Sequence, residues 1–247
     1  AMDTIGKSQK KKNAVATVLM IILFTILAIL IVLPIYAIFM ASFHPGNFLL
    51  QYGLNLDPDF AHMTLSNYVL LFTGDHDYWI WFGNSLILTV LTVVLTLLIS
   101  SFVAYGFAAY DFKGKNFFFV IVLIILSIPF EVIMLPLYKQ ISTWGLMDSY
   151  VAVVLPFLAH ASTIFFFRQY LLGLPKSLIE AGRIDGATEY GIFFKLIVPI
   201  MKPAFSAMAI LNGMNAWNNY MWPLLVIRSS SKYTLTIGLN TLINPYG

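Results

Sequence analysis

The chain has 247 residues, of which 60% are hydrophobic and only 10% charged, and its mean hydropathy is +0.84. This composition excludes an ordinary water-soluble domain and is typical of a protein that crosses a membrane several times. The lack of cysteine excludes disulfide bonds, thiolate metal sites and a catalytic cysteine. The net charge of +3 is explained most simply by basic cytoplasmic loops, and we expect no nucleic-acid partner.

The first predicted elements are a polar cytoplasmic tail over residues 1–13 and a transmembrane helix over residues 14–43. About 20 apolar residues in a helix cross the roughly 30 Å hydrocarbon core of a bilayer. The segment is too long for a signal peptide and has no small-residue cleavage site. We therefore predict a retained anchor rather than a cleaved leader.

The following loop, residues 44–81, is rich in Asp, Gly, Pro and aromatic residues. It is interpreted either as a docking surface or as a solvated loop whose tryptophans mark the membrane interface. His44, His62 and His76 lie among several carboxylates, but their spacing is not that of metal ligands. No metal site is predicted.

Four further segments are long and apolar enough to span a bilayer. These predicted helices cover residues 82–110, 117–138, 150–171 and 203–227. The expected fold is therefore an all-α membrane protein with five visible spans between residues 14 and 227, followed by a polar external segment over residues 228–247.

The basic residues orient this topology, because cytoplasmic loops carry an excess of Lys and Arg. With the N-terminal tail inside, only three of the 14 basic residues fall outside, namely Lys139, Arg228 and Lys232. The inside residues are Lys7, Lys10, Lys11, Lys12, Lys113, Lys115, Arg168, Lys176, Arg183, Lys195 and Lys202. A cytoplasmic N-terminus is therefore predicted.

One cytoplasmic stretch, SLIEAGRIDGATEYGIFFKLIVP from Ser177 to Pro199, is polar and interrupted by glycine. Pro175 disfavours helix at the residue before it, and Ser177 with Glu180 has the S-x-x-E pattern of a capping box. Gly186 can end that helix in the left-handed conformation, and Thr188 can cap a second one. Two short helices joined by a glycine bend are expected.

The second helix carries an apolar face at helical spacing, formed by Ile192, Phe193, Leu196 and Ile197. The first presents charged residues to the cytoplasm. Such an element is either an ordinary interfacial helix-turn-helix or a handle for a soluble partner, and the residues alone leave both open.

Polar side chains inside spans are costly and usually face a cavity or a partner. On a continuous helix over 203–227, Asn212, Asn215, Asn218 and Asn219 share an arc of roughly 120°, together with Trp222. Amides both donate and accept hydrogen bonds, as sugar hydroxyls do. The alternative is that they bond neighbouring helices. Glu131, in the outer half of the 117–138 span, is a further candidate for the substrate path.

The cytoplasmic stretch resembles the EAA motif of binding-protein-dependent ABC importer permeases, E-A-A, three residues, G, nine residues, then I-x-L-P. Glu180, Ala181 and Gly186 stand at motif positions, and Leu196, Val198 and Pro199 close the motif with conservative aliphatic replacements. Gly182 also departs from the pattern, at a cost of about 1 kcal/mol in helix propensity relative to Ala. The resemblance extends over nearly the whole chain, through FVAYGFAAYDFKGK (102–115), IPFEVIMLPLY (128–138), the run from Phe165 to Ala204 and NAWNNYMWPL (215–224).

The resemblance is to the second permease of maltose-type importers, and it implies a type I transmembrane domain whose cytoplasmic loop, residues 174–202, carries a coupling helix. That helix would insert into a cleft on an ATPase and transmit its movement by alternating access. The implied coupling residues are Glu180, Ala181, Gly182, Arg183, Asp185 and Gly186.

The implied function is that of a permease subunit, forming half of the path for a sugar or oligosaccharide in the cell membrane of a prokaryote. The implied partners are a second permease, two ATPase subunits and an external solute-binding protein. ATP and Mg²⁺ would bind the ATPase, because this chain has no GxxxxGK[ST] phosphate loop, carries no cofactor and is not expected to be an enzyme.

Such permeases usually have six spans, so a missing sixth implies a truncated chain. Permeases of the same class for polyols, glycerol phosphates or peptides are the alternative. A secondary transporter is disfavoured, because the chain shows no self-similar halves and few charges within its spans.

Overall fold

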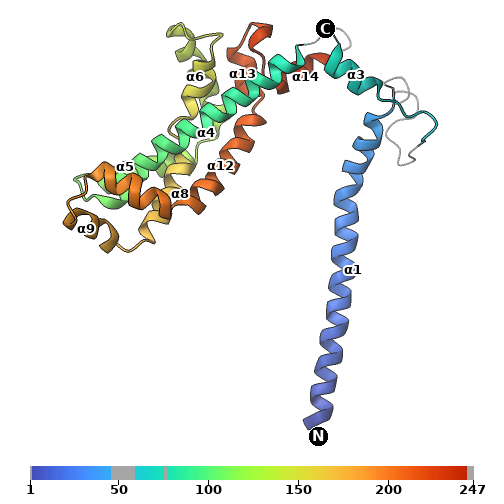
Figure 1. Ribbon diagram of the computed structural model, residues 1–247, viewed down its shortest axis with the longest axis horizontal. Helices are drawn as coiled ribbons and strands as arrows, with labels where there is room; N and C mark the ends of the chain where they lie inside the picture. Colours follow the sequence, from blue (N-terminus) through green and yellow to red (C-terminus); the bar gives the residue numbers. More distant parts are fainter. Residues whose placement is uncertain (1, 46–58, 75–76, 244–247) are drawn as a thin grey trace. The chain divides into compact units, whose positions relative to one another are not determined.

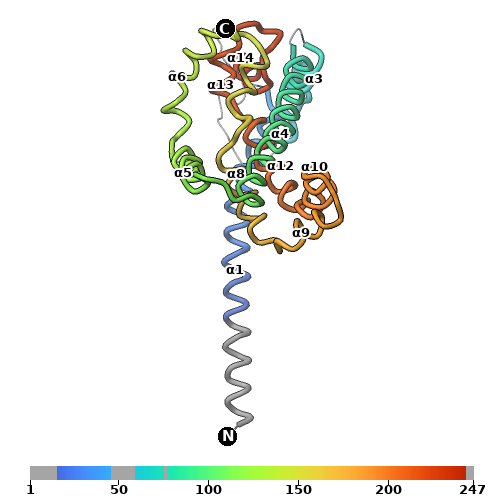
Figure 2. Tube along the Cα trace, turned by 90° about the vertical axis from the view of Figure 1, so that its left-hand side faces the viewer, coloured from blue at the N-terminus to red at the C-terminus, as the bar shows by residue number. Residues whose placement is uncertain are grey.

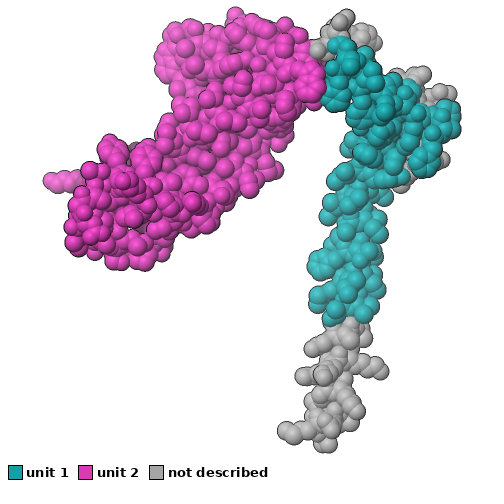
Figure 3. All heavy atoms as spheres, in the orientation of Figure 1, with its two compact units in different colours: residues 1–76 teal, residues 77–247 magenta. Residues whose placement is uncertain are grey.

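The structure, a computed structural model, describes the backbone of residues 2–45, 59–74 and 77–243, with side chains from residue 16 onwards. These parts are helical, without strands. The chain divides into two compact units, residues 1–76 and 77–247, which are described separately (Figure 3).

The described helices of the first unit are α1 (Met2–Ser42) and α3 (Ser66–Thr73). The part of α1 from Ala16 to Ser42 has a mean hydropathy of 3.3 and none of it is buried, so it is long and apolar enough to cross a membrane. It coincides with the span predicted over residues 14–43. The Asn67 amide donates to the carbonyl oxygens of Ser42 (3.0 Å) and His44 (2.8 Å), which satisfies acceptors at and just beyond the end of α1.

The second unit is built around α4 (Tyr78–Ala109), an unbroken 32-residue helix (Figure 1). Helices α8 (Ala161–Leu172) and α12 (Lys202–Trp217) pack along its length. Small or hydroxyl-bearing residues such as Thr96, Ser100 and Ala104 form much of its buried face. Small residues at such positions let neighbouring helices approach closely in a membrane.

Two of the predicted spans are broken helices. Residues 117–138 do not form one span, because α5 (Lys115–Leu126) and α6 (Phe130–Thr143) meet at 101°. Pro129 explains the break, since proline lacks an amide donor and disfavours helix at the preceding residue. Residues 150–171 are likewise divided between Tyr150–Phe157 and α8, with a bend of 42°.

The predicted span over residues 203–227 is also interrupted, because α12 ends at Trp217 and α13 (Met221–Val226) begins four residues later. The segment Glu189–Ile200, which precedes α12, meets it at 77°. The described part of the chain therefore holds two helices that can each cross a membrane alone, or up to five spans if each bent pair counts as one.

Residues 235–243, expected within a polar external segment, form a further helix, α14 (Leu235–Ile243), that packs on α4. A Cβ atom on Gly238 would lie 2.1 Å from the Trp81 ring, so only glycine allows this contact. The predicted turn residues Asn244 and Pro245 lie outside the described residues.

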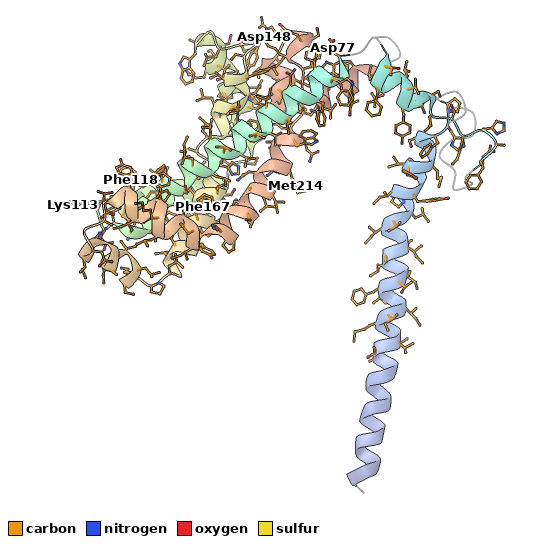
Figure 4. All side chains as sticks on the ribbon, in the orientation of Figure 1. Asp77, Lys113, Phe118, Asp148, Phe167 and Met214 are labelled. Atoms are coloured by element: carbon orange, nitrogen blue, oxygen red, sulfur yellow. The ribbon has the colours of Figure 1, made fainter. Side chains whose placement is uncertain are left out.

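Hydrogen bonds join two loops at the end of the second unit that carries Asp77 and Asp148, and this contact is called the loop crosslink. Lys113 and Phe118 mark the opposite end of the unit (Figure 4). The Asp148 carboxylate accepts hydrogen bonds from the Ser229 hydroxyl (2.5 Å), the Ser229 amide (3.0 Å) and the Lys232 ammonium (3.0 Å). These bonds, those from Ser229 foremost, hold the pKa of Asp148 well below its usual range.

Two apolar cores stabilise the second unit. One lies where the stretch from Ser177 to Pro199 packs on α4 and α8, and it includes Tyr105, Phe167 and Phe193. The other includes Leu88 and Trp222 and gathers residues from α4, α6 and α13. Figure 2 shows the helices of the first core, α9 and α10, at one end of this unit and α13 and α14 at the other.

Candidate functional site

The helix α9 (Ser177–Ile184) begins without the predicted capping box. Lys176 already has helical backbone angles (φ −59°, ψ −27°), and the amides of Leu178 and Ile179 donate to the carbonyl oxygens of Pro175 and Lys176. The backbone of the preceding turn therefore satisfies the amides that a Ser177 cap would have served. The Glu180 side chain is exposed and unused by the cap.

The end of α9 is the predicted glycine bend. Gly186 has φ +75°, and its amide donates to the Arg183 carbonyl oxygen (3.1 Å), while the Ala187 amide donates to the Gly182 carbonyl oxygen (3.0 Å). This pair of bonds is a Schellman motif, which favours glycine at the left-handed position. No other atom lies within 4 Å of a Cβ at Gly186, so its backbone conformation, not crowding, requires glycine.

The second helix also begins as predicted. The Thr188 hydroxyl accepts a hydrogen bond from the Gly191 amide (3.1 Å) and caps α10 (Glu189–Ile192). A π-helical turn, Phe193–Ile197, and the short α11 (Val198–Ile200) continue it. Of the predicted apolar face, Ile192, Phe193 and Ile197 are buried, whereas Leu196 lies at the edge and is 39% exposed.

Gly182, the departure from the EAA pattern, is buried where α9 packs on this second helix. A Cβ atom at this position would lie 3.0 Å from Ile192 Cγ1 and 3.0 Å from Leu196 Cδ1, closer than ordinary carbon contacts. The glycine therefore allows the two helices to approach closely, which offsets its low helix propensity.

The opposite face of α9 is open to solvent. Glu180, Ala181, Arg183 and Asp185 are exposed, and Ile184 at the tip is 85% exposed. The face of α9 opposite Gly182 therefore presents charged side chains and one apolar side chain, Ile184, to the surroundings.

A cavity of about 230 Å³ lies within the second unit. Its polar lining combines hydroxyl groups of α4 with amides of α12 and the segment after it, and its apolar lining includes Phe130 and Phe157. None of its described lining residues is Lys, Arg, Asp or Glu. The polar lining residues are Ser85, Thr92, Thr96, His160, Asn212, Asn215, Asn219 and Thr234.

The four predicted amides do not share one helical face, because α12 ends before Asn218. Asn212, Asn215 and Asn219 line the cavity. Asn212 is buried and its amide donates to the Thr163 hydroxyl (3.1 Å), so it also joins two helices. The side-chain amide of Asn218 donates to the Met214 carbonyl oxygen (2.9 Å), and Asn218 is not among the residues that line the cavity.

The two other predicted path residues also lie outside the cavity lining. Trp222 is fully buried, donates its indole N–H to the Ala152 carbonyl oxygen (3.0 Å) and packs edge-on against Phe130. Glu131 is exposed in the first turn of α6. In this chain neither residue joins the three lining amides.

Sequence reasoning missed the hydroxyl residues of α4. Ser85, Thr92 and Thr96 recur at spacings of seven and four, so the signal was a stripe of hydroxyl residues on one face of an apolar helix. His160 also lines the cavity, and its Nδ1 atom lies 2.8 Å from the Ser162 hydroxyl. Among the described residues no group of three or more His, Asp or Glu is placed to hold a metal ion.

Two apolar helices long enough to cross a membrane, three bent helix pairs and a cavity lined by polar side chains other than Lys, Arg, Asp and Glu are typical of an α-helical membrane transport subunit. Residues 96–246 match the family of binding-protein-dependent transport system inner membrane components. The chain belongs to this family, and it is accordingly a non-catalytic ABC transporter permease with ATP hydrolysis on a separate subunit.

Relatives in two organisms carry the name arabinooligosaccharides transport system permease protein AraQ. The protein of Halalkalibacterium halodurans is 50% identical over 239 residues, which cover 97% of this chain and 86% of the relative. That of Bacillus subtilis is 51% identical over 224 residues, covering 91% and 80%. A solved bacterial ABC transporter involved in import of the acidic polysaccharide alginate superposes with a TM-score of 0.83 at 25% identity, covering 96% of this chain and 82% of that one.

Proposed function

We propose that this permease forms half of the translocation path for a neutral oligosaccharide of the arabinooligosaccharide kind. It pairs with a second permease, and an external solute-binding protein delivers the sugar. Two ATPase subunits, which bind ATP and Mg²⁺, dock at the cytoplasmic face. The N-terminus lies in the cytoplasm of a prokaryote. The observation that carries this proposal is the cavity whose polar lining is made of hydroxyl, carboxamide and imidazole groups, with no Lys, Arg, Asp or Glu among its described residues.

The chemistry of the cavity suits a sugar. Hydroxyls and carboxamides both donate and accept hydrogen bonds, so they can pair with sugar hydroxyls in either direction. Phe130 and Phe157 add apolar surface for the carbon faces of a sugar ring. A volume of about 230 Å³ equals roughly seven or eight water molecules, which is the scale of one sugar ring.

The same lining disfavours the anionic alternative. A glycerol phosphate would bring a buried negative charge, which is costly unless it is paired with a cation. The described lining residues include no Lys or Arg to pair with it. The identity of about one half to the AraQ relatives supports the sugar over polyols and peptides as well.

Alanine substitutions test the sugar path. Asn215→Ala and Asn219→Ala each remove an amide from the lining, and a lost hydrogen bond of about 1 kcal/mol predicts a roughly fivefold rise in the KM for uptake of labelled arabinooligosaccharide. Asn240→Ala is the matched control, because its side chain accepts from the Tyr220 hydroxyl (3.2 Å) away from the cavity. Unchanged uptake and selectivity in both cavity variants would reject the path.

The exposed face of α9 is the proposed ATPase docking surface, through Glu180, Ile184 and Asp185. Gly186→Val tests this assignment, because valine is strained at φ +75° and would redirect the end of α9. The variant should reach the membrane and assemble with its partner permease but lose ATP-driven uptake. Full uptake by a correctly assembled Gly186→Val transporter would refute the assignment.

A further inference from the structure

A polar cluster lies where the end of α4 meets the two cytoplasmic-stretch helices. Glu189, the first residue of α10, accepts hydrogen bonds from the Arg183 guanidinium (2.7 Å), the Tyr110 hydroxyl (2.5 Å) and the Tyr105 hydroxyl (3.4 Å). Its donors come from α9 and from the end of α4. One carboxylate therefore joins three segments.

The cluster is anchored on its α4 side. Tyr105 is only 4% exposed, and its ring packs against Phe193 with centroids 5.2 Å apart. The Arg183 guanidinium lies over the Tyr110 ring at 5.6 Å. Burial, followed by the hydrogen bond to Glu189, raises the pKa of Tyr110, so its hydroxyl remains a donor at neutral pH.

Packing between α9 and α4 is incomplete beside this cluster. A hollow of about 70 Å³ is lined by Tyr105 and Ala108 of α4, Leu171 of α8, and Ile179 and Arg183 of α9. Because close-packed side chains transmit displacement and a void does not, the apolar contact here is a poor connection between α9 and α4. The polar contacts through Glu189 span the same junction.

We propose that Glu189 is a positioning residue that makes α9 and the end of α4 move together. The proposal rests on the proposed docking of the ATPase on α9. Helix α4 also supplies Ser85, Thr92 and Thr96 to the cavity, so a displacement transmitted to α4 reaches the sugar path. The Arg183 and Glu189 side chains are 41% and 42% exposed, and such ion pairs contribute little to folding stability. Removing the Glu189 carboxylate should therefore weaken the transmission of movement from α9 to α4 while leaving the fold intact.

The experiment uses the assembled transporter, with both permeases, the ATPase subunits and the binding protein, reconstituted in proteoliposomes. Uptake of labelled arabinooligosaccharide and ATP hydrolysis are measured together for wild type, Glu189→Gln and Tyr110→Phe. Glu189→Gln should lower the uptake per ATP hydrolysed at least fivefold, and Tyr110→Phe about twofold, with the binding-protein-stimulated ATPase rate within twofold of wild type. An unchanged ratio in Glu189→Gln would overturn the proposal.

Asp111→Asn is the matched control. Asp111 is a carboxylate at the same end of α4, and its side chain is 89% exposed and ion-paired with Lys115 at 3.0 Å. Its substitution should leave the uptake per ATP at the wild-type value. A fall equal to that of Glu189→Gln would mean that any lost charge at this end uncouples the transporter, and would overturn the specific role of Glu189.

A distance measurement tests the movement itself. Because the chain has no cysteine, Ala187→Cys and Lys113→Cys can carry spin labels in this subunit once any cysteines in the partners are replaced. The distance between the labels should be the same with and without ATP in the wild-type background, and should change with ATP when Glu189→Gln is added. A distance that changes with ATP in the wild-type background would show that α9 and α4 move separately, and would overturn the proposal.

The Gly186→Val variant separates the two proposals. If it retains full uptake, α9 is not the coupling element and the proposed docking fails. If it loses uptake while Glu189→Gln keeps the wild-type uptake per ATP, the docking stands and the role of Glu189 is refuted.

Discussion

Gly182→Ala tests whether close packing, rather than chance, places glycine where the EAA pattern has alanine. The new methyl group would lie 3.0 Å from Ile192 Cγ1 and from Leu196 Cδ1. Overpacking of this kind costs about 1–3 kcal/mol, whereas alanine gains about 1 kcal/mol in helix propensity. The expected net destabilisation is about 1 kcal/mol, which corresponds to a fall of about 2–4 °C in the thermal midpoint for a chain of this size.

The second variant relieves the same contact. Leu196→Ala removes the Cδ1 atom of a residue that is 39% exposed, so the added methyl at position 182 has one clash fewer. In that background Gly182→Ala should be neutral or slightly stabilising, which gives a coupling free energy of about 1 kcal/mol between the two sites.

The assay is heating of the tagged subunit within the assembled transporter, followed by fluorescence-detected size-exclusion chromatography. The same fall in midpoint for Gly182→Ala in both backgrounds would refute the packing explanation. A rise in midpoint in the wild-type background would refute it as well, because helix propensity would then outweigh the contacts.

The other predictions concern the remaining contacts of the second unit. Gly238→Ala should destabilise the chain by about 3 kcal/mol or more, measured as a lower thermal midpoint, because its Cβ would overlap the buried Trp81 ring. Trp222→Phe should cost about 1–3 kcal/mol, since the Ala152 carbonyl oxygen loses its donor and a void remains; a midpoint equal to wild type would contradict the buried hydrogen bond. The loop crosslink at Asp148 should be complete above pH 4 and lost as the pH falls through the lowered pKa of its carboxyl, because a depressed pKa contributes stability only while the group is ionised. The amides of Arg228 and Ser229 should therefore exchange slowly, with protection that does not depend on pH from 5 to 8. They should lose this protection in Asp148→Ala, which removes the acceptor.

The stretch from Ser177 to Pro199 could be predicted in detail because its signals are local. Gly186 and Thr188 act on neighbouring backbone groups, and both adopt the predicted roles. The Ser177 cap failed for a local reason too, since a helical Lys176 had already extended the first turn. Gly182 could not be explained locally, because its neighbours Ile192 and Leu196 are ten or more residues away in the sequence.

The breaks within spans were harder to predict, because hydropathy is continuous across them. Pro129 carries a signal, the bias of proline against helix in the preceding residue, but an apolar run of 22 residues outweighed it. The break after Trp217 has no proline at the junction, and the helical arc drawn through Asn218 and Asn219 assumed a continuity that the backbone does not have. The amides that line the cavity could therefore be identified only from the tertiary structure.

Because α4 is one unbroken helix, it can tilt as a rigid body. A 32-residue helix is about 48 Å long, and this one carries Tyr105 near one end and Ser85 near the other. If it tilts as a rigid rod about Tyr105, each 10° of rotation displaces its Tyr78 end, about 40 Å away, by about 7 Å. A bend like those in the neighbouring spans would absorb this rotation. Under the proposed coupling, the unbroken α4 would instead pass a small movement at its Tyr105 end on to the residues that line the cavity.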